Sequence, residues 1–180
     1  MTGPIWTVSN ALSLARLLLV LPISWLLLGN DSSNNPYIVG LIIIAIMTDF
    51  FDGRIARRLG QVTEVGKIID PIADKVAVGI VSLILSLQGK LPMWLLVTVL
   101  ARDIIIFSGG LYIQKSKGVL LQSNEVGKWT VTILTMLLLV TILDINELLW
   151  LKEILIVTSL ILLIVSFSLY VKRFLDAIVA

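Results

Sequence analysis

The chain alternates long apolar runs with short polar or charged segments. Six apolar runs approach or exceed the length of about 20 residues that crosses a bilayer as a helix. They cover residues 12–29, 36–51, 66–87, 92–113, 126–143 and 148–171, and turn-forming or charged residues separate them. The pattern predicts an all-α integral membrane protein with six transmembrane helices in one bundle. We expect one membrane domain over residues 1–180, in which residues 1–10 form a short interfacial segment anchored by Trp6.

Composition narrows the chemistry that such a bundle can perform. The chain is 58% hydrophobic, well above a soluble domain, and its charged residues are few and clustered. It contains no histidine and no cysteine, which excludes imidazole sites, thiolate sites and disulfides. Acid–base or metal chemistry must therefore depend on carboxylates, supported by Lys, Arg, Tyr or Ser.

The distribution of basic residues predicts the orientation of the chain. Short loops rich in Lys and Arg stay in the cytoplasm. Such residues concentrate after the second run, after the fourth run and at the C-terminus: Arg54, Arg57, Arg58, Lys67, Lys115, Lys117, Lys128, Lys172 and Arg173. We expect a multi-pass protein of the cell inner (cytoplasmic) membrane with both termini in the cytoplasm. The N-terminus lacks the basic start of a cleaved signal peptide.

Four aspartates lie at the cytoplasmic ends of the second and third runs. Asp49 and Asp52 are three residues apart and Asp70 and Asp74 four apart, spacings that put each pair on one face of a helix. Four converging carboxylates repel one another unless cations neutralise them. Oxygen ligands suit Mg²⁺ or Mn²⁺, and two such ions form a clamp for displacement at phosphorus. The alternative, simple ion pairing with neighbouring basic residues, is disfavoured because ionisable residues inside spans are functional by default.

The same segment resembles the signature of the CDP-alcohol phosphotransferases, D-x-x-D-G-x-x-A-R, a spacer, then G-x-x-x-D-x-x-x-D. All eight signature positions are filled within 26 residues: Asp49, Asp52, Gly53, Ala56, Arg57, Gly66, Asp70 and Asp74. The resemblance implies transfer of a phosphatidyl group from CDP-diacylglycerol to an alcohol, with release of CMP, at an active site on the cytoplasmic membrane boundary. It also implies two divalent cations and a homodimer.

The resemblance also assigns roles to the signature residues. Asp49, Asp52, Asp70 and Asp74 would hold the two metal ions, and Asp74 would also act as general base on the acceptor hydroxyl. The CDP group would be bound by Asp52, Gly53, Ala56, Arg57, Gly66 and Asp70. The partners implied are CDP-diacylglycerol, an alcohol acceptor and the lipid bilayer. No nucleic-acid partner is expected, since the basic residues follow the membrane edge without interleaved aromatics.

The acceptor is predicted from weaker resemblances. Asn10, Ser13 and Arg16 fit an N-x-x-[ST]-x-x-R start found in the phosphatidylglycerophosphate synthase and cardiolipin synthase branches. Gly127-Lys128 favours the former branch, whose acceptor is glycerol 3-phosphate. Against it, Thr130 and Gly110 stand where that branch usually has a lysine and an arginine. The alternative acceptor is phosphatidylglycerol, as in cardiolipin synthesis of the CDP-lipid type. Candidate acceptor-binding residues are Arg102, Lys128, Lys115 and Lys117.

Two further expectations concern the fourth run. Arg102 and Asp103 lie in mid-span, and because adjacent residues do not face each other on a helix, each is expected to have a different partner. Gly109 and Gly110 suggest close packing against another helix.

A small membrane transporter with a carboxylate ion site is the alternative function from another class of protein. Transporter sites, however, lie near the midplane on broken helices, whereas these acids lie at helix ends.

Overall fold

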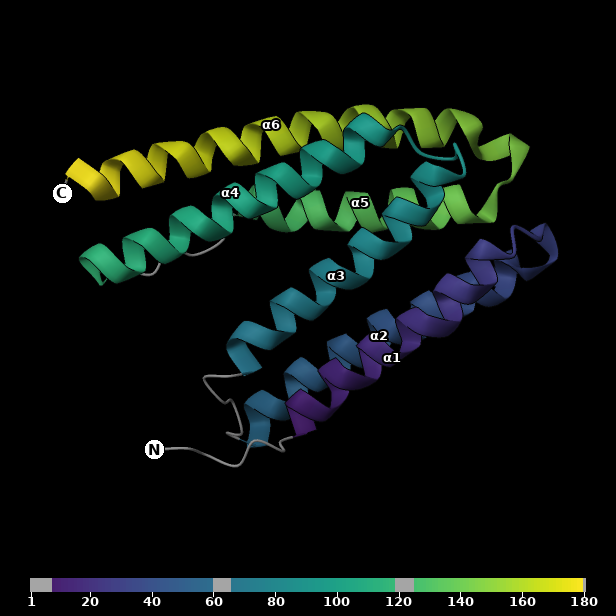
Figure 1. Ribbon diagram of the computed structural model, residues 1–180, viewed down its shortest axis with the longest axis horizontal. Helices are drawn as coiled ribbons and strands as arrows, with labels where there is room; N and C mark the ends of the chain where they lie inside the picture. Colours follow the sequence, from purple (N-terminus) through teal and green to yellow (C-terminus); the bar gives the residue numbers. More distant parts are fainter. Residues whose placement is uncertain (1–7, 60–65, 119–124, 180) are drawn as a thin grey trace. The chain divides into compact units, whose positions relative to one another are not determined.

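The computed structural model describes the backbone of residues 8–59, 66–118 and 125–179, and the side chains of residues 18–48, 75–118 and 125–178. Within these ranges the protein consists of helices without strands (Figure 1). The elements are α1 (Val8–Leu28), η1 (Ser32–Asn34), α2 (Asn35–Leu59), α3 (Gly66–Leu87), α4 (Met93–Lys117), α5 (Glu125–Leu143), η2 (Asn146–Leu148) and α6 (Leu149–Val179). The prediction of an all-α protein is confirmed. Residues 1–7 of the expected interfacial segment lie outside the described part.

Two helices extend furthest beyond the apolar runs that predicted them. α2 continues to Leu59 and α6 to Val179, beyond runs that end at residues 51 and 171. The thickness of the hydrocarbon layer limits the apolar run and not the helix. Charged residues with good helix propensity, such as Arg57 and Lys172, therefore extend each helix past the apolar layer.

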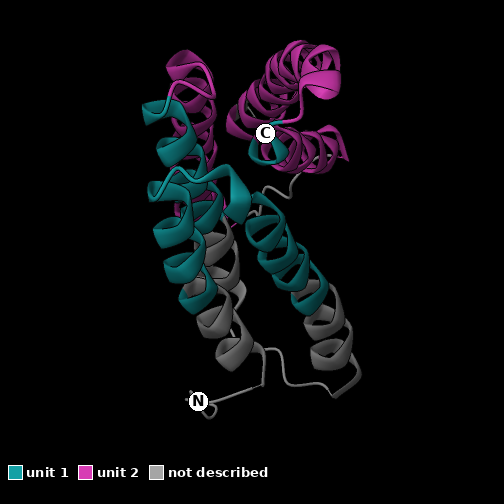
Figure 2. Cartoon of the chain, turned by 90° about the vertical axis from the view of Figure 1, so that its right-hand side faces the viewer, with its two compact units in different colours: residues 1–88, 142–144 teal, residues 89–141, 145–180 magenta. Residues whose placement is uncertain are grey.

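The chain forms two compact units, residues 1–88 with 142–144 and residues 89–141 with 145–180 (Figure 2). In the first unit α1 packs against both α2 and α3. Val20, Ile23 and Leu27 are buried on α1 at spacings of three and four, and Ile38 of α2 and Leu85 of α3 are buried as well. This spacing is the apolar stripe by which a helix packs on its neighbours.

Polar contacts satisfy backbone groups at the helix ends that are far from the four signature aspartates. Asp31 is the N-cap of η1, and its carboxylate accepts a 2.9 Å hydrogen bond from the Ser33 backbone N–H. This bond holds the pKa of Asp31 below its usual range. Gln88, just after α3, donates from Nε2 to the carbonyl of Leu27 at 2.6 Å and so satisfies a carbonyl in the last turn of α1.

In the second unit α4 packs against α6. The buried positions of α6 follow spacings of three and four and alternate large with small residues: Leu155, Ser159, Leu163, Ser166 and Tyr170. Ser159 and Ser166 are fully buried. Small hydroxyl residues let membrane helices approach closely, so this stripe fits an interface between helices in a bilayer.

The outward faces of both units are apolar. Trp25 is 75% exposed, and Val157, Ile161 and Ile164 on α6 are each more than half exposed. In the described part of the chain, Met93–Lys117, Glu125–Leu143 and Asn146–Ile178 are long and apolar enough to cross a membrane. The protein is thus an all-α membrane protein whose exposed apolar side chains face lipid. The count of six spans and the single domain remain predictions.

Candidate active site

The four signature aspartates lie on two helices of the first unit. Asp49 and Asp52 belong to the C-terminal part of α2, and Asp70 and Asp74 to the N-terminal part of α3. Both pairs lie inside helices, so the spacings of three and four have the helical meaning that was predicted. Six residues join α2 to α3, and such a segment spans at most about 20–25 Å. The aspartate-bearing parts of the two helices are therefore consecutive in the chain, and the facing helix ends are at most about 25 Å apart.

The side chains of residues 49–74 lie outside the described part of the structure. The convergence of Asp49, Asp52, Asp70 and Asp74 on metal ions stays a prediction. The same holds for the CDP-binding roles of Gly53, Ala56, Arg57 and Gly66. The donor set itself fits hard divalent cations, because it offers four carboxylates and no nitrogen or sulfur ligand.

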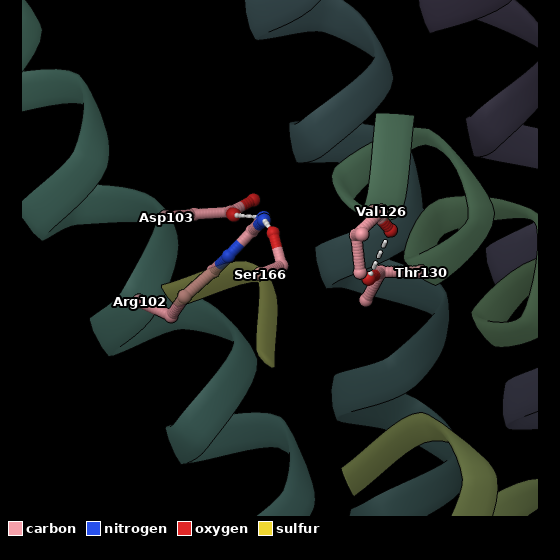
Figure 3. A network of polar contacts seen from close by, with 5 residues as sticks. All are labelled: Arg102, Asp103, Val126, Thr130 and Ser166. Carbon is pink, nitrogen blue, oxygen red and sulfur yellow. Dashed lines mark hydrogen bonds and ion pairs between the residues drawn. The ribbon is translucent and has the colours of Figure 1, made fainter. Parts of the chain in front are cut away.

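A buried polar cluster lies in the second unit, between α4 and α6 (Figure 3). Arg102 Nη1 donates to Asp103 Oδ1 at 2.8 Å, and Arg102 Nη2 donates to Ser166 Oγ at 2.5 Å. The Arg102 and Asp103 side chains are only 15% and 19% exposed. Arg102 Nε is buried and has no hydrogen-bond partner. A mid-span cation with an unsatisfied donor is a candidate for binding an anion.

The expectation that Arg102 and Asp103 have different partners was wrong. The two side chains form an ion pair with each other, although their Cα atoms are adjacent in the helix. The arginine side chain is long enough for its guanidinium to reach the neighbouring carboxylate. Avoiding two isolated charges in an apolar span outweighs the unfavourable spacing.

The three candidate lysines lie at the helix ends. Lys128 forms an exposed 2.7 Å pair with Glu125 in the first turn of α5. Lys115 and Lys117 are exposed in the last turn of α4, which ends at Gly118 in the left-handed conformation. Lys115 is 13 residues beyond Arg102, which is about 20 Å along the helix. Direct contact of these lysines with the acceptor stays a prediction. We expect Lys115 and Lys117 to attract an anion at longer range.

Packing explains Thr130, whereas nothing in the described part of the structure requires a glycine at Gly110. Thr130 is fully buried, and its hydroxyl donates to the Val126 carbonyl at 2.8 Å (Figure 3). A Cβ at Gly110 would lie 3.9 Å from the Tyr170 hydroxyl, whereas one at Gly109 would lie 2.7 Å from it. The close packing expected of Gly109 is thus with α6 of the same chain.

The sequence interpretation missed Ser166 and Tyr170. Ser166 accepts from Arg102, and Tyr170 Oη donates to the Ile106 carbonyl at 2.8 Å. The available signal was two polar residues four apart within an apolar run, on the side of the helix that also carries Ser159 and Leu163. That signal marks a buried face, although it does not identify the partner helix.

Comparison with known proteins identifies the family of this helical membrane protein. The family model described as CDP-alcohol phosphatidyltransferase matches residues 6–165. This match covers most of the chain, including both signature helices and α4. The chain belongs to the CDP-alcohol phosphatidyltransferase family.

Several curated relatives carry names that describe the reaction further. A protein of Aquifex aeolicus named CDP-diacylglycerol--glycerol-3-phosphate 3-phosphatidyltransferase is 34% identical over 172 residues, which cover 92% of this chain and 94% of that one. A Bacillus subtilis protein of the same name is 32% identical over 66% of this chain and 67% of its own. A putative cardiolipin synthase of Mycobacterium bovis is 32% identical over 62% of this chain and 52% of its own.

Proposed function

We propose that this protein transfers the phosphatidyl group of CDP-diacylglycerol to glycerol 3-phosphate and releases CMP, as a phosphatidylglycerophosphate synthase of phospholipid biosynthesis. The observation that carries the proposal is the alignment with the Aquifex aeolicus protein, which extends over nearly the whole of both chains. Family membership and the complete aspartate signature also favour the enzyme over a transporter.

The proposed chemistry assigns each signature residue a task. The acceptor hydroxyl attacks the phosphatidyl phosphorus, a new O–P bond forms, and the P–O bond to CMP breaks. Asp74 takes the proton of the attacking hydroxyl, since an alcohol is a poor nucleophile at neutral pH. Arg57 would bind the diphosphate, and Gly53, Ala56 and Gly66 would keep the space beside the CDP group free of large side chains.

Two divalent cations, Mg²⁺ or Mn²⁺, would be held by Asp49, Asp52, Asp70 and Asp74. When bound, they supply positive charge that stabilises the phosphate oxygens during the displacement. In an apolar membrane protein, four carboxylates on neighbouring helix ends are costly without such counter-charge. The four aspartates match divalent cations in the chemical type and the number of their donor groups.

Arg102 is the proposed binding residue for the acceptor phosphate. It is a mostly buried cation with an unpartnered Nε–H, and a guanidinium binds phosphate through two parallel N–H donors. Lys115, Lys117 and Lys128 would raise the local concentration of the anionic acceptor. The site would face the cytoplasm in a homodimer embedded in the inner membrane.

One observation favours phosphatidylglycerol as a second candidate acceptor. The charge of Arg102 is balanced by Asp103 at 2.8 Å, and Thr130 and Gly110 add no cation near the buried cluster. A site with little net positive charge suits a phosphodiester better than the dianionic phosphate of glycerol 3-phosphate. The putative cardiolipin synthase among the relatives agrees with this alternative.

The test is CMP release by the purified protein from CDP-diacylglycerol, with single acceptors supplied in parallel. Glycerol 3-phosphate is expected to support turnover, while serine and inositol phosphate are not. Turnover with phosphatidylglycerol alone would replace the proposed acceptor by the second candidate. If none of these acceptors supports CMP release, the proposal is refuted.

A further inference from the structure

Two polar contacts join α4 to α6 in matching register. Arg102 donates to Ser166, and Tyr170 donates to the carbonyl of Ile106. On each helix the two positions are four residues apart, which is about one helical turn. Because both sequence numbers rise together along the contact, α4 and α6 run parallel here, and α6 presents Ser166 and Tyr170 to successive turns of α4.

Ser166 and Tyr170 differ from several other hydroxyl side chains of this unit, because each forms a hydrogen bond to another helix. Thr98, Thr130, Thr132, Thr135 and Ser168 each donate to the carbonyl four residues earlier on their own helix. Those bonds satisfy a hydroxyl without involving a second helix. Ser166 is fully buried and accepts a charged hydrogen bond from another helix. Its oxygen therefore has a use beyond satisfying its own polarity.

The hydrogen bonds of Arg102 leave part of its guanidinium available. A guanidinium has five N–H donors, of which Asp103 takes one on Nη1 and Ser166 one on Nη2. The buried Nε–H is among the donors left without a partner. A buried donor on a cation is costly when unpaired, so an oxyanion that accepted it would be bound favourably.

Asp103 alone would not keep donors of the Arg102 guanidinium available for a ligand. A carboxylate next to an arginine pairs best through two parallel bonds, which would turn the donors towards Asp103 and away from a ligand. The bond from Nη2 to Ser166 restrains the guanidinium from the opposite helix. Tyr170 fixes the register of α4 one turn further on, so that Ser166 and Arg102 stay aligned.

We propose that Ser166 is a positioning residue that holds Arg102 between α4 and α6, so that donors of its guanidinium remain directed to the oxyanion of the acceptor. This inference rests on the proposed function, in which Arg102 binds the acceptor phosphate. Ser166 itself does not touch the substrate. Its removal should weaken acceptor binding and leave the binding of CDP-diacylglycerol unchanged.

The experiment measures initial rates of CMP release by Ser166→Ala in the purified full chain, with each substrate varied in turn. We expect KM for the acceptor to rise about three- to tenfold, the size of one ordinary hydrogen bond, because Ser166 acts on the acceptor only through Arg102, with KM for CDP-diacylglycerol unchanged. Arg102→Lys keeps the charge and loses the fork of donors, and should raise the acceptor KM further. Ser166→Cys, which nearly preserves the volume and has a weak acceptor, should resemble Ser166→Ala.

Ser168→Ala is the matched control. Ser168 lies two residues from Ser166 on the same helix, is exposed, and donates to the Ile164 carbonyl. It should leave both KM values unchanged. An unchanged acceptor KM in Ser166→Ala and Ser166→Cys would overturn the inference. So would a parallel rise of both KM values, or a loss of thermal stability that accounts for the lower rate.

The wild-type protein separates this inference from the proposed function. If it uses phosphatidylglycerol in place of glycerol 3-phosphate, the proposed acceptor is wrong, and the same KM comparison with phosphatidylglycerol decides the role of Ser166. If it uses glycerol 3-phosphate and the Ser166 variants bind it normally, only the role of Ser166 is wrong. If neither acceptor supports CMP release, both the proposed function and the role of Ser166 are wrong.

Discussion

The hydroxyl oxygen of Tyr170 lies 2.7 Å from the point that a Cβ at Gly109 would occupy. Real Cβ atoms essentially never approach a heavy atom so closely. The hydroxyl is held there by its hydrogen bond to the Ile106 carbonyl, and the Phe174 ring lies 3.3 Å from the same point. Gly109 thus permits the close contact between α4 and α6 at this point.

Gly109→Ala should destabilise the protein by about 1–3 kcal/mol, the usual cost of forcing an extra methyl group into a packed interface. Thermal unfolding in detergent measures the effect. Gly110→Ala is the control, because its Cβ would meet Tyr170 at an ordinary distance of 3.9 Å, and alanine is the better helix former. It should be neutral or slightly stabilising. Equal destabilisation by both substitutions would contradict the structure at this interface.

Tyr170→Phe should partly rescue Gly109→Ala. Tyr170→Phe alone loses the bond to Ile106, which for hydrogen bonds within membranes costs roughly 0.6 kcal/mol on average. In the double variant the clashing oxygen is absent, so the combined loss should be smaller than the sum of the two single losses. Strict additivity in this double-mutant cycle would show that Gly109 and Tyr170 are not in contact.

Apolar runs predicted where all the described helices lie, but they predicted the ends of only some of them. The run at 66–87 matches α3 to the residue, because a Gly and a turn segment bound it on both sides. For α2 and α6, hydropathy falls at the membrane edge while helix propensity continues through Arg, Lys and Leu. Composition therefore marks the edge of the lipid, and local propensity and capping mark the end of the helix.

The candidate site also has a part that the sequence predicted and a part that it did not. The aspartate signature is local, since four carboxylates and their spacing fall within 26 residues, and it was recognisable without any knowledge of packing. Ser166 is 64 residues from Arg102, and nothing in the α6 run indicates which helix it contacts. The pairing of Arg102 with Asp103 was mispredicted because helix geometry locates Cβ atoms, while a long side chain can reach past its own position.

Asp74→Asn should reduce CMP formation by at least about a hundredfold, the lower end of what a positioned general base contributes. Asparagine is nearly isosteric with aspartate and cannot accept the proton of the acceptor hydroxyl. The variant should still insert into the membrane and elute as a folded protein. Asp176→Asn, at an exposed position of α6, is the matched control and should retain full activity. Normal turnover in Asp74→Asn would remove the base assignment.

Chelation should abolish CMP release reversibly. Four carboxylates without any nitrogen or sulfur ligand suit Mg²⁺ or Mn²⁺, and displacement at phosphorus without counter-charge would be strongly disfavoured. EDTA treatment followed by gel filtration is expected to give an inactive protein, and either ion added back should restore the rate. Full activity after exhaustive chelation would exclude the proposed role of the four aspartates.

The absence of cysteine from the 180 residues makes the membrane topology directly testable. Single cysteines introduced by Ser32→Cys, Ser116→Cys and Asn146→Cys all lie at exposed positions outside or at the ends of the apolar runs. If α2, α3 and α4 each cross the bilayer, positions 32 and 116 lie on opposite sides. If α5 crosses as well, positions 32 and 146 lie on the same side.

The basic residues near position 116 place the side of position 116 in the cytoplasm. A membrane-impermeant maleimide should therefore label Ser32→Cys and Asn146→Cys in intact spheroplasts, and Ser116→Cys only after permeabilisation. Labelling of positions 32 and 146 from opposite sides would change the parity of the spans between them and contradict the six-span topology.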